Sequence, residues 1–459
     1  MGRADIEASQ PGAPSSPTRE LAAWAVSAKP GSIGATAHAW AEDAILDWFG
    51  VTLAGSREPL SLMLAEAARE EGDGPARLVG LADSLSPLNA ALVNGAASHA
   101  LDYDDVNSRM MGHPTVPLVP VLLAIADTRK VSGPDFLDAF VVGYETEVLA
   151  AEMVGLSHYD RGWHMTATIG TLGAAAAAAR LLGLDAERAA HALGLAVAQA
   201  AGLKSMFGTM SKPFQVGKSA SNGLLAARLA GKGMTSRTDA LECAQGLADT
   251  QSDGFTPQEI SPGGNSAYAV EGNLFKYHAA CYLTHSSIEA ARQLRLERGV
   301  APEAIERLTI EVNKGALSVC NIERPETGLQ VKFSLRHTVA MALSGRDTAD
   351  LNAYTDDLAQ DEALRELGRR SMVVGVEADT RTVGRVRAEL KDGTVVEEIR
   401  DVGVPAADQP AQRQRLLEKY RTLGEPVLGA ARTVELADRI FALAEIEDAS
   451  VLSALAQPD

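Results

Sequence analysis

The sequence predicts a mainly α-helical protein with a smaller α+β segment, and three features of the chain lead to this fold class. Residues 19–268 place apolar side chains at the three- and four-residue spacing of buried helix faces. Residues 269–405 contain alternating runs typical of strands, and helical spacing returns over residues 406–459. We therefore expect a large all-helical domain built from both chain ends, with an α+β lid domain inserted between them.

The N-terminal segment, residues 1–18, is polar and rich in Pro and Ser, which predicts a disordered tail. It contains no apolar core of a signal peptide. Helices are expected next over residues 37–55, 112–130, 134–155, 166–184, 185–202 and 217–234. The Ala-rich stretch 166–182 predicts a tightly packed buried helix rather than a membrane span.

In the α+β segment, residues 307–320 and both halves of 382–402 alternate between apolar and polar side chains. The two halves of 382–402 meet at Asp392-Gly393, a dipeptide typical of β-hairpin turns. Helices are expected at 284–299 and 334–345 within the segment, and at 410–428 and 431–456 after it.

Composition disfavours several kinds of partner and cofactor. The chain has 42 Lys and Arg against 60 Asp and Glu, a formal charge of −18, so nucleic acid and anionic membranes are poor partners. Its three cysteines, Cys243, Cys281 and Cys320, form no CxxC pair. A disulfide framework, a zinc site and an iron–sulfur cluster are therefore not indicated, and a reducing, cytoplasmic setting is expected.

Ionisable residues gather at four places where the helical pattern breaks. They are His99, Asp102, Asp104, Asp105 and His113 within 97–117; Arg161 and His164 within 159–170; Lys212 and Lys218 within 207–223; and Lys276, His278 and His285 within 273–291. Each group also has a purely structural interpretation. Aspartates cap helices, a histidine on an Ala-rich face is often a core residue, and lysines are commonly exposed or lie along apolar surface.

Three of these residues adjoin a neighbour that affects the backbone: "GHP" contains His113, "GWH" contains His164 and "SKP" contains Lys212. A stiff backbone holds a general acid or base within reach of its proton. Histidine titrates near neutral pH, and lysine stabilises the charge that develops when a proton leaves the carbon beside a carboxylate. The set therefore predicts proton abstraction from a carboxylate substrate. Metal-assisted hydrolysis, with Asp102, Asp104, His113 and His164 as ligands, is an alternative that the lack of an HExxH-like pair disfavours.

Four motifs resemble, in order, the successive signatures of the MmgE/PrpD family. They are "NGAASHALDYDDVNSRMMGHPTVPLVPVLLA", "GWHMTATIGTLGAAAAAARLLGL", "FGTMSKPFQVGKSASNGLLAA" and "KYHAACYLTHSSIEAA". The family includes 2-methylcitrate dehydratase, cis-aconitate decarboxylase and iminodisuccinate epimerase. The resemblance runs from about residue 20 to 440. It implies a helical large domain, an α+β lid, a homodimer, and an active site between the domains that needs no cofactor and no metal.

The resemblance also implies catalytic roles for five residues: Asp102, His113, His164, Lys212 and Lys276. Two positions depart from the pattern of the decarboxylases. His337 stands where they have Tyr, and Val106 where they have Thr. We expect His337 to act as a second base in place of the Tyr.

The expected function is that of a lyase of the 2-methylcitrate dehydratase kind, acting on a small di- or tricarboxylate. Three alternatives remain open: an epimerase of an iminodisuccinate-like substrate, a cis-aconitate-type decarboxylase, and a carboxylate-binding protein without activity. Arg161, Lys218 and Arg336 are expected to contact substrate carboxylates.

Overall fold

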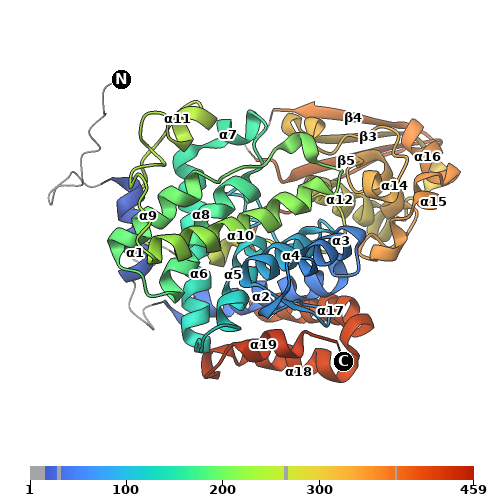
Figure 1. Cartoon of the computed structure of the whole chain (residues 1–459). Coiled ribbons are helices and arrows are strands. Elements are labelled where there is room, and N and C mark those ends of the chain that lie inside the picture. The colour runs from blue at the N-terminus through green and yellow to red at the C-terminus, as the bar shows by residue number, and fades with distance from the viewer. Residues whose placement is uncertain (1–15, 28–32, 263–266, 378–379, 459) are drawn as a thin grey trace.

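The computed structural model describes residues 16–27, 33–262, 267–377 and 380–458, and it confirms a mainly helical fold with small sheets (Figure 1). The first part consists of α1 (Pro17–Ser27), α2 (Ala35–Gly55), α3 (Pro59–Arg69), α4 (Pro87–His99), α5 (Thr115–Ala126), α6 (Gly133–Val154), α7 (Leu156–Asp160), α8 (Met165–Leu181), α9 (Ala186–Val197), α10 (Ser211–Gly231) and α11 (Leu247–Gln251). This part is not wholly helical, because a short antiparallel pair, β1 (Asp73–Arg77) and β2 (Ser84–Leu85), follows α3. Most of the predicted tail lies outside the described residues, but α1 already begins at Pro17, before the predicted end of the tail.

The α+β part contains α12 (Tyr282–Arg298), β3 (Ile305–Asn313), α13 (Gly328–Val331), α14 (Leu335–Leu343), α15 (Asp356–Ala359), α16 (Glu362–Arg369), β4 (Ser371–Val376), β5 (Val383–Leu390) and β6 (Val395–Asp401). The strand order is β4-β3-β5-β6, with β4 parallel to β3 and the other pairs antiparallel. The predicted hairpin at Asp392-Gly393 is confirmed, and Gly393 has the positive φ of 86° that such a turn requires. The sequence analysis missed β4, whose alternation is weak.

The chain ends with α17 (Gln409–Leu428), α18 (Ala430–Phe441) and α19 (Ser450–Leu455), which lie below α2 and α5 in Figure 1. Helix α17 packs along α2, so both chain ends share one apolar core. That core joins residues 21–275 to residues 416–456, while a second core lies mainly within residues 279–388. Among the described helices, none combines the length and the apolar character that a membrane crossing requires.

Helix α10 fits closely between α4 and α8 because small residues line both contacts. A Cβ atom on Gly217 would lie 2.2 Å from the carbonyl oxygen of Leu92 in α4, and one on Gly223 would lie 2.5 Å from Ala174 in α8. Such distances leave room only for glycine. The start of α10, which carries Lys212, is thereby held beside the loop that follows α4.

That loop, residues 100–114, connects α4 to α5 and carries the aspartates of the first motif. Three residues after the last residue of α4, Asp102 adopts a left-handed conformation, with φ at 52°, which turns the chain away from the helix direction. Further along, Val106 and Leu274 exchange two backbone hydrogen bonds of 2.7 and 2.8 Å. This bridge fixes the loop next to the segment that carries Lys276.

Candidate active site

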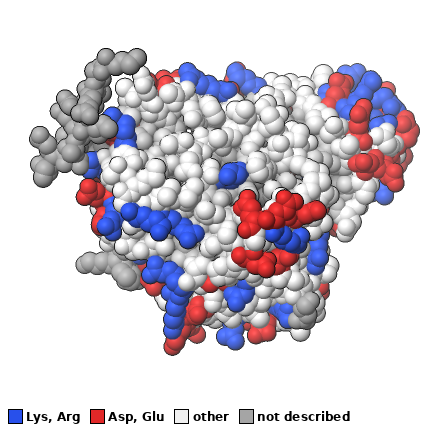
Figure 2. All heavy atoms as spheres, in the orientation of Figure 1, with Lys and Arg blue, Asp and Glu red and all other residues white. Residues whose placement is uncertain are grey.

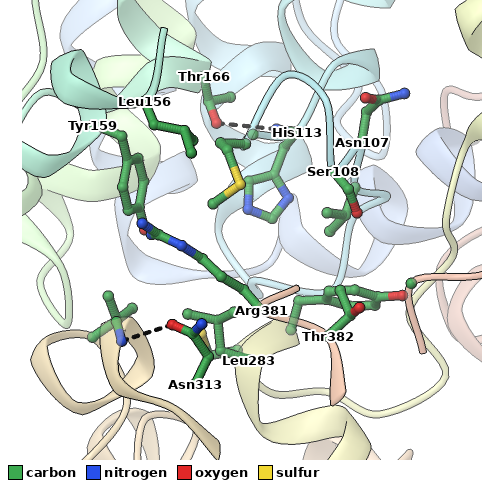
Figure 3. Close-up of a pocket in the computed structure, with 18 of the residues that line it drawn as sticks. Asn107, Ser108, His113, Leu156, Tyr159, Thr166, Leu283, Asn313, Arg381 and Thr382 are labelled. Carbon is green, nitrogen blue, oxygen red and sulfur yellow. Dashed lines mark hydrogen bonds between the residues drawn. The ribbon is translucent and has the colours of Figure 1, made fainter. Parts of the chain in front are cut away.

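A cavity of about 880 Å³ lies between the helical part and the α+β part (Figure 3). The helical part contributes residues of the 102–113 loop, the region around α7 and the start of α10. The α+β part contributes the first turn of α12 and the ends of the strands. Its polar and charged lining consists of Asp102, Asn107, Ser108, Arg109, His113, Tyr159, Asp160, His164, Thr166, Lys212, Cys281, Tyr282, Asn313, Lys314, Thr380, Arg381, Thr382 and Asp401.

Asp102 is buried at the inner end of this cavity, where two ammonium groups meet its carboxylate. Its Oδ1 lies 2.7 Å from Lys212 Nζ and 3.0 Å from Lys276 Nζ. Burial alone would raise the pKa of Asp102, but these two cations hold that pKa well below its usual value. Burial likewise disfavours the ammonium form of Lys276, yet Asp102 and Asp104 raise the pKa of Lys276 above its ordinary value. The Asp102–Lys276 pair is therefore fully charged.

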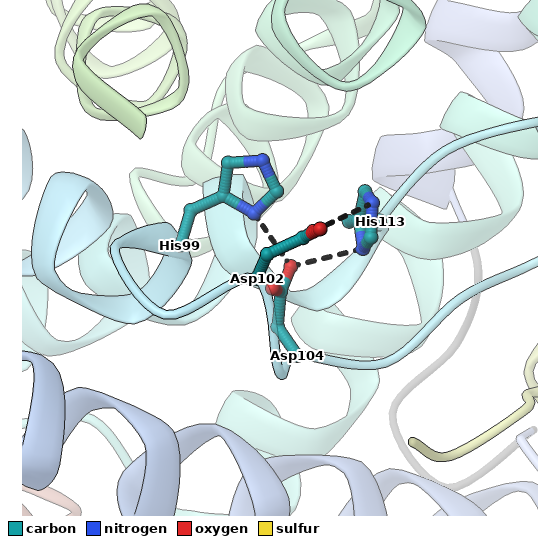
Figure 4. Close-up of side chains that lie close together, drawn as sticks. All are labelled: His99, Asp102, Asp104 and His113. Carbon is teal, nitrogen blue, oxygen red and sulfur yellow. Dashed lines mark hydrogen bonds and ion pairs between the residues drawn. The ribbon is translucent and has the colours of Figure 1, made fainter. Parts of the chain in front are cut away.

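Asp104 accepts hydrogen bonds from two histidines, as Figure 4 shows. His99 Nδ1 lies 2.8 Å and His113 Nδ1 lies 3.0 Å from Asp104 Oδ2. His113 Nδ1 also lies 2.8 Å from the carbonyl oxygen of Asp105. Because both neighbours of His113 Nδ1 accept hydrogen bonds, that nitrogen carries the proton. The other ring nitrogen, Nε2, lies 4.0 Å from Asp102 Oδ1, and the ring borders the cavity.

His99 and His164 are buried and neutral. Burial lowers the pKa of His99 to about 4, and burial together with nearby cations lowers the pKa of His164 well below its usual value. The two rings stack with centroids 5.7 Å apart, and the His113 ring meets His99 edge-on at 4.8 Å. The three imidazoles thus form one packed group, in which His164 and His113 border the cavity.

The outer end of the cavity has its own basic residues. Arg381, just before β5, lies above the Tyr159 ring and pairs with Asp160 at 3.1 Å. In Figure 3 its guanidinium reaches toward Tyr159 on the far wall. Lys314 follows β3 and Arg109 belongs to the loop after α4. Each of these three cations is also paired with a carboxylate, Arg381 with Asp160, Lys314 with Glu377 and Arg109 with Glu152. A second carboxylate of a substrate bound at this end would share a cation with one of these partners.

The structure brings together five of the nine predicted site residues. Asp102, His113, His164 and Lys212 border the cavity, while Lys276 lies behind Asp102 and is fully buried.

The other four are not among the residues that line the cavity. Arg161 is exposed and pairs with Asp253 at 2.5 Å. Lys218 lies on the same helix as Lys212, but six residues later, which turns it by about 240° to another face. Arg336 donates to Asn321 at 2.6 Å, and the buried His337 ring lies 3.2 Å from the carbonyl oxygen of Leu358. The arrangement therefore gives no support to the expected substrate contacts of Arg161, Lys218 and Arg336 or to the expected role of His337 as a second base, and these stay predictions.

Four residues that the structure places here were not among the nine predicted site residues: His99 and Asp104, which pair with each other, and Arg381 and Cys281. The sequence contains a signal for the pairing of His99 with Asp104, since the two residues flank the end of a helix within six residues. It contains no such signal for Arg381, which lies far along the chain in a connection between strands.

His99, Asp102, Asp104 and His113 offer ligand atoms that lie within 4.8 Å of one another (Figure 4). A divalent ion among them would face two ammonium groups within 3.0 Å of Asp102 Oδ1. Like charges at such distances repel strongly in a buried site. The donor set therefore fits a cation poorly while both lysines are charged.

Sequence comparison decides the family. A model of the MmgE/PrpD N-terminal domain matches residues 19–260, and one of the MmgE/PrpD C-terminal domain matches residues 278–443. The chain belongs to the MmgE/PrpD family. The cis-aconitate decarboxylase of Aspergillus terreus is 28% identical to this protein. The aligned region covers 95% of this protein and 94% of the decarboxylase. The cis-aconitate decarboxylase-like protein oryM of Aspergillus oryzae is 29% identical over 95% of this protein and 96% of oryM. Human cis-aconitate decarboxylase is 27% identical over 81% of this protein and 79% of the human enzyme.

Proposed function

We propose that this MmgE/PrpD protein is a lyase that acts on a small di- or tricarboxylate by proton transfer at a carbon beside a carboxylate. One observation carries the proposal. His113, whose Nδ1–H is fixed by Asp104 and the Asp105 carbonyl, shares the inner cavity with the Lys212 ammonium. A base and a cation placed together are what the removal of such a proton requires.

In this mechanism His113 Nε2 takes the proton from carbon, and the Lys212 ammonium stabilises the negative charge on the carboxylate oxygens. A positioned donor of this kind contributes about 3–4 kcal/mol to lowering the barrier. Neutral His164, beside the same cavity, exchanges hydrogen bonds with the substrate. Arg381 binds a second carboxylate at the outer end, which orients the reacting carbon toward His113.

Two lyase outcomes follow from this arrangement. In a dehydration, loss of hydroxide follows proton removal, as in the expected 2-methylcitrate-type reaction. In a decarboxylation no proton is first removed from carbon: carbon dioxide leaves, its bonding electrons remain on carbon, and His113, protonated beforehand from solvent, delivers a proton there. The names of the relatives favour cis-aconitate as the first substrate to test.

The two departures from the decarboxylase pattern differ in their weight. Val106 borders the cavity, so the missing hydroxyl bears on the chemistry, whereas His337 does not line it. Val106 is thus the feature that favours dehydration over decarboxylation. An epimerase remains a second candidate, because it shares the first proton transfer and needs only reprotonation on the opposite face.

The test is incubation of the protein in D₂O with cis-aconitate, 2-methylcitrate, citrate or iminodisuccinate, with EDTA present, followed by proton NMR. Carbon dioxide loss from cis-aconitate identifies a decarboxylase, and a new vinylic proton from a hydroxy acid identifies a dehydratase. Deuterium at an α-carbon without net product identifies an epimerase. A rise in melting temperature with substrate but no reaction contradicts the proposal and identifies a carboxylate-binding protein. Activity that EDTA abolishes contradicts the metal-free mechanism.

A homodimer, which the family resemblance implies, is part of the proposal. Figure 2 shows a largely uncharged area across the face that carries α10, interrupted by a basic side chain and bordered by charged side chains. Such an area suits an interface. Light scattering behind a sizing column would give about twice the chain mass of 48.2 kDa for the dimer, and the single mass would contradict it.

A further inference from the structure

Three buried lysines donate to three consecutive backbone carbonyls beside the cavity. Lys332 Nζ lies 2.8 Å from the oxygen of Leu101, Lys276 Nζ lies 2.7 Å from that of Asp102, and Lys419 Nζ lies 2.8 Å from that of Tyr103. We refer to Lys276, Lys332 and Lys419 as the lysine clamp. Its members come from the loop before α12, the end of α13 and the middle of α17.

The lysine clamp supplies hydrogen-bond donors to backbone carbonyls that have no partner within the helix. Helix α4 ends at His99, so carbonyls in the following residues lack partners within the helix. Asp102 then holds a left-handed conformation that a side chain disfavours and that surrounding contacts must maintain. Cations are favourable near the carbonyl end of a helix. Each ammonium supplies a charge-assisted hydrogen bond, which is stronger than one from a neutral donor.

Burial makes this arrangement notable, since an ammonium taken out of water is destabilising unless it is paired. The clamp residues are 0%, 6% and 8% exposed for Lys276, Lys332 and Lys419. Lys419 is balanced by Asp47 at 2.7 Å. Lys332 is held by the Leu101 carbonyl and lies 5.4 Å from the Tyr354 ring centroid. Simple packing does not call for three cations at one loop.

We propose that Lys332 and Lys419 are positioning residues, which fix the 101–103 backbone so that the Asp102 carboxylate meets Lys212 and His113. The inference rests on the proposed function, because it assigns these two lysines to the geometry of the same site. It adds residues that contact neither the substrate nor the reacting atoms.

Lys332 makes the clamp sensitive to alkaline pH. Burial lowers the pKa of Lys332 to about 8, with Asp102 and Glu58 opposing that shift and Lys276 and Lys212 adding to it. Above that pH the charge-assisted bond to Leu101 becomes a neutral one. Turnover is therefore expected to fall as pH rises through about 8. Arginine at position 332 keeps its charge, so in K332R this fall in turnover should occur at a higher pH.

The experiment uses full-length K332Q and K332R, with K232Q as the matched control, because Lys232 is an exposed lysine at the end of α10. Two readouts are taken: kcat and KM across pH with whichever tested carboxylate the wild type turns over, and hydrogen exchange of residues 100–107 by mass spectrometry. We expect K332Q to lose about tenfold or more in kcat with KM within about threefold, and to exchange faster in that segment. K332R should restore the wild-type kcat and the slow exchange, and its kcat should no longer fall near pH 8. K419Q should lose kcat and exchange faster, K419R should restore both, and neither should change the fall of kcat near pH 8.

Wild-type kcat and exchange in K332Q would overturn the proposal, as would a lower melting temperature with an unchanged pH profile and unchanged exchange. The exchange readout does not depend on turnover. If no carboxylate reacts, the proposed function fails, while exchange in K332Q and K332R still decides whether the clamp holds the loop.

Discussion

The charge of Asp102 is what keeps Lys276 protonated in a fully buried position, and D102N tests this. Lys276 Nζ lies 3.0 Å from Asp102 Oδ1. With an effective dielectric constant of about 20, one charge at that distance contributes about 5–6 kcal/mol to holding the proton on Lys276. The pKa of Lys276 is therefore expected to fall in D102N, because burial opposes the ammonium form and this carboxylate no longer offsets it.

Two consequences can be measured. The free energy of unfolding in urea should fall by about 3–5 kcal/mol, because D102N leaves buried cations unpaired. Turnover of the carboxylate that the wild type accepts should fall by about 10²–10³. D160N is the matched control, since Asp160 is a half-exposed carboxylate at the outer end of the cavity. It should lose less than about 1 kcal/mol of stability.

A charge-balanced double variant, D102N with K276M, separates the electrostatic effect from loss of packing. Removing the cation together with its anion should return part of the lost stability, but not the activity. If D102N unfolds like the wild type, or if the two substitutions are simply additive, the proposed coupling between Asp102 and Lys276 is refuted.

Four further predictions concern single residues. H113Q should lower kcat by about 10²–10⁴ with KM little changed, which steady-state kinetics would reveal, and an unchanged kcat would exclude His113 as the base. R381Q should raise KM about tenfold or more while kcat is kept, and equal loss in both would contradict its role in binding. Burial raises the pKa of Glu145 to about 8, so the native state keeps a proton that the unfolded chain releases between pH 4.5 and 8. Glu145 should therefore make stability fall as pH rises through that window, by at most about 1.4 kcal/mol per unit, and E145Q should remove this contribution from the slope seen in urea titrations at pH 5–8. H337F should turn over within about threefold of wild type and lose about 1 kcal/mol of stability with its bond to Leu358, whereas a large loss of turnover would restore His337 to the mechanism.

The sequence predicts those features that depend on neighbouring residues. Apolar spacing located most of the long helices, although α1, α3, α4 and α16 were not predicted, and Asp392-Gly393 located the hairpin. Both kinds of feature are set by local conformation. The motifs around His113 and Lys212 were likewise recognisable, since each joins a titratable side chain to a proline that limits the backbone.

The sequence could not show in which direction a side chain points, nor which residues far apart in the chain come into contact. Lys218 and Lys212 look equivalent in one motif, yet the helical turn between them separates their side chains. Arg336 and His337 follow Ser334, which caps α14, and the orientation of that helix in the α+β part turns both away from the cavity. Arg381 reaches the cavity only because the sheet places the start of β5 there. These outcomes depend on tertiary packing, which no local pattern encodes.

The packing of α17 on α2 also bears on how the protein is made. A ribosome that has finished α2 at residue 55 must add the chain up to Leu416 before the first core can close. At about 5–20 residues per second this takes about 20–70 s, during which the apolar surface of α2 has no final partner. Lys419 reaches the Tyr103 carbonyl only after the same delay, so the cavity acquires its finished shape among the last events of synthesis. A nascent chain of this protein is thus long exposed to aggregation, and chaperone binding during translation is expected to centre on its N-terminal helices.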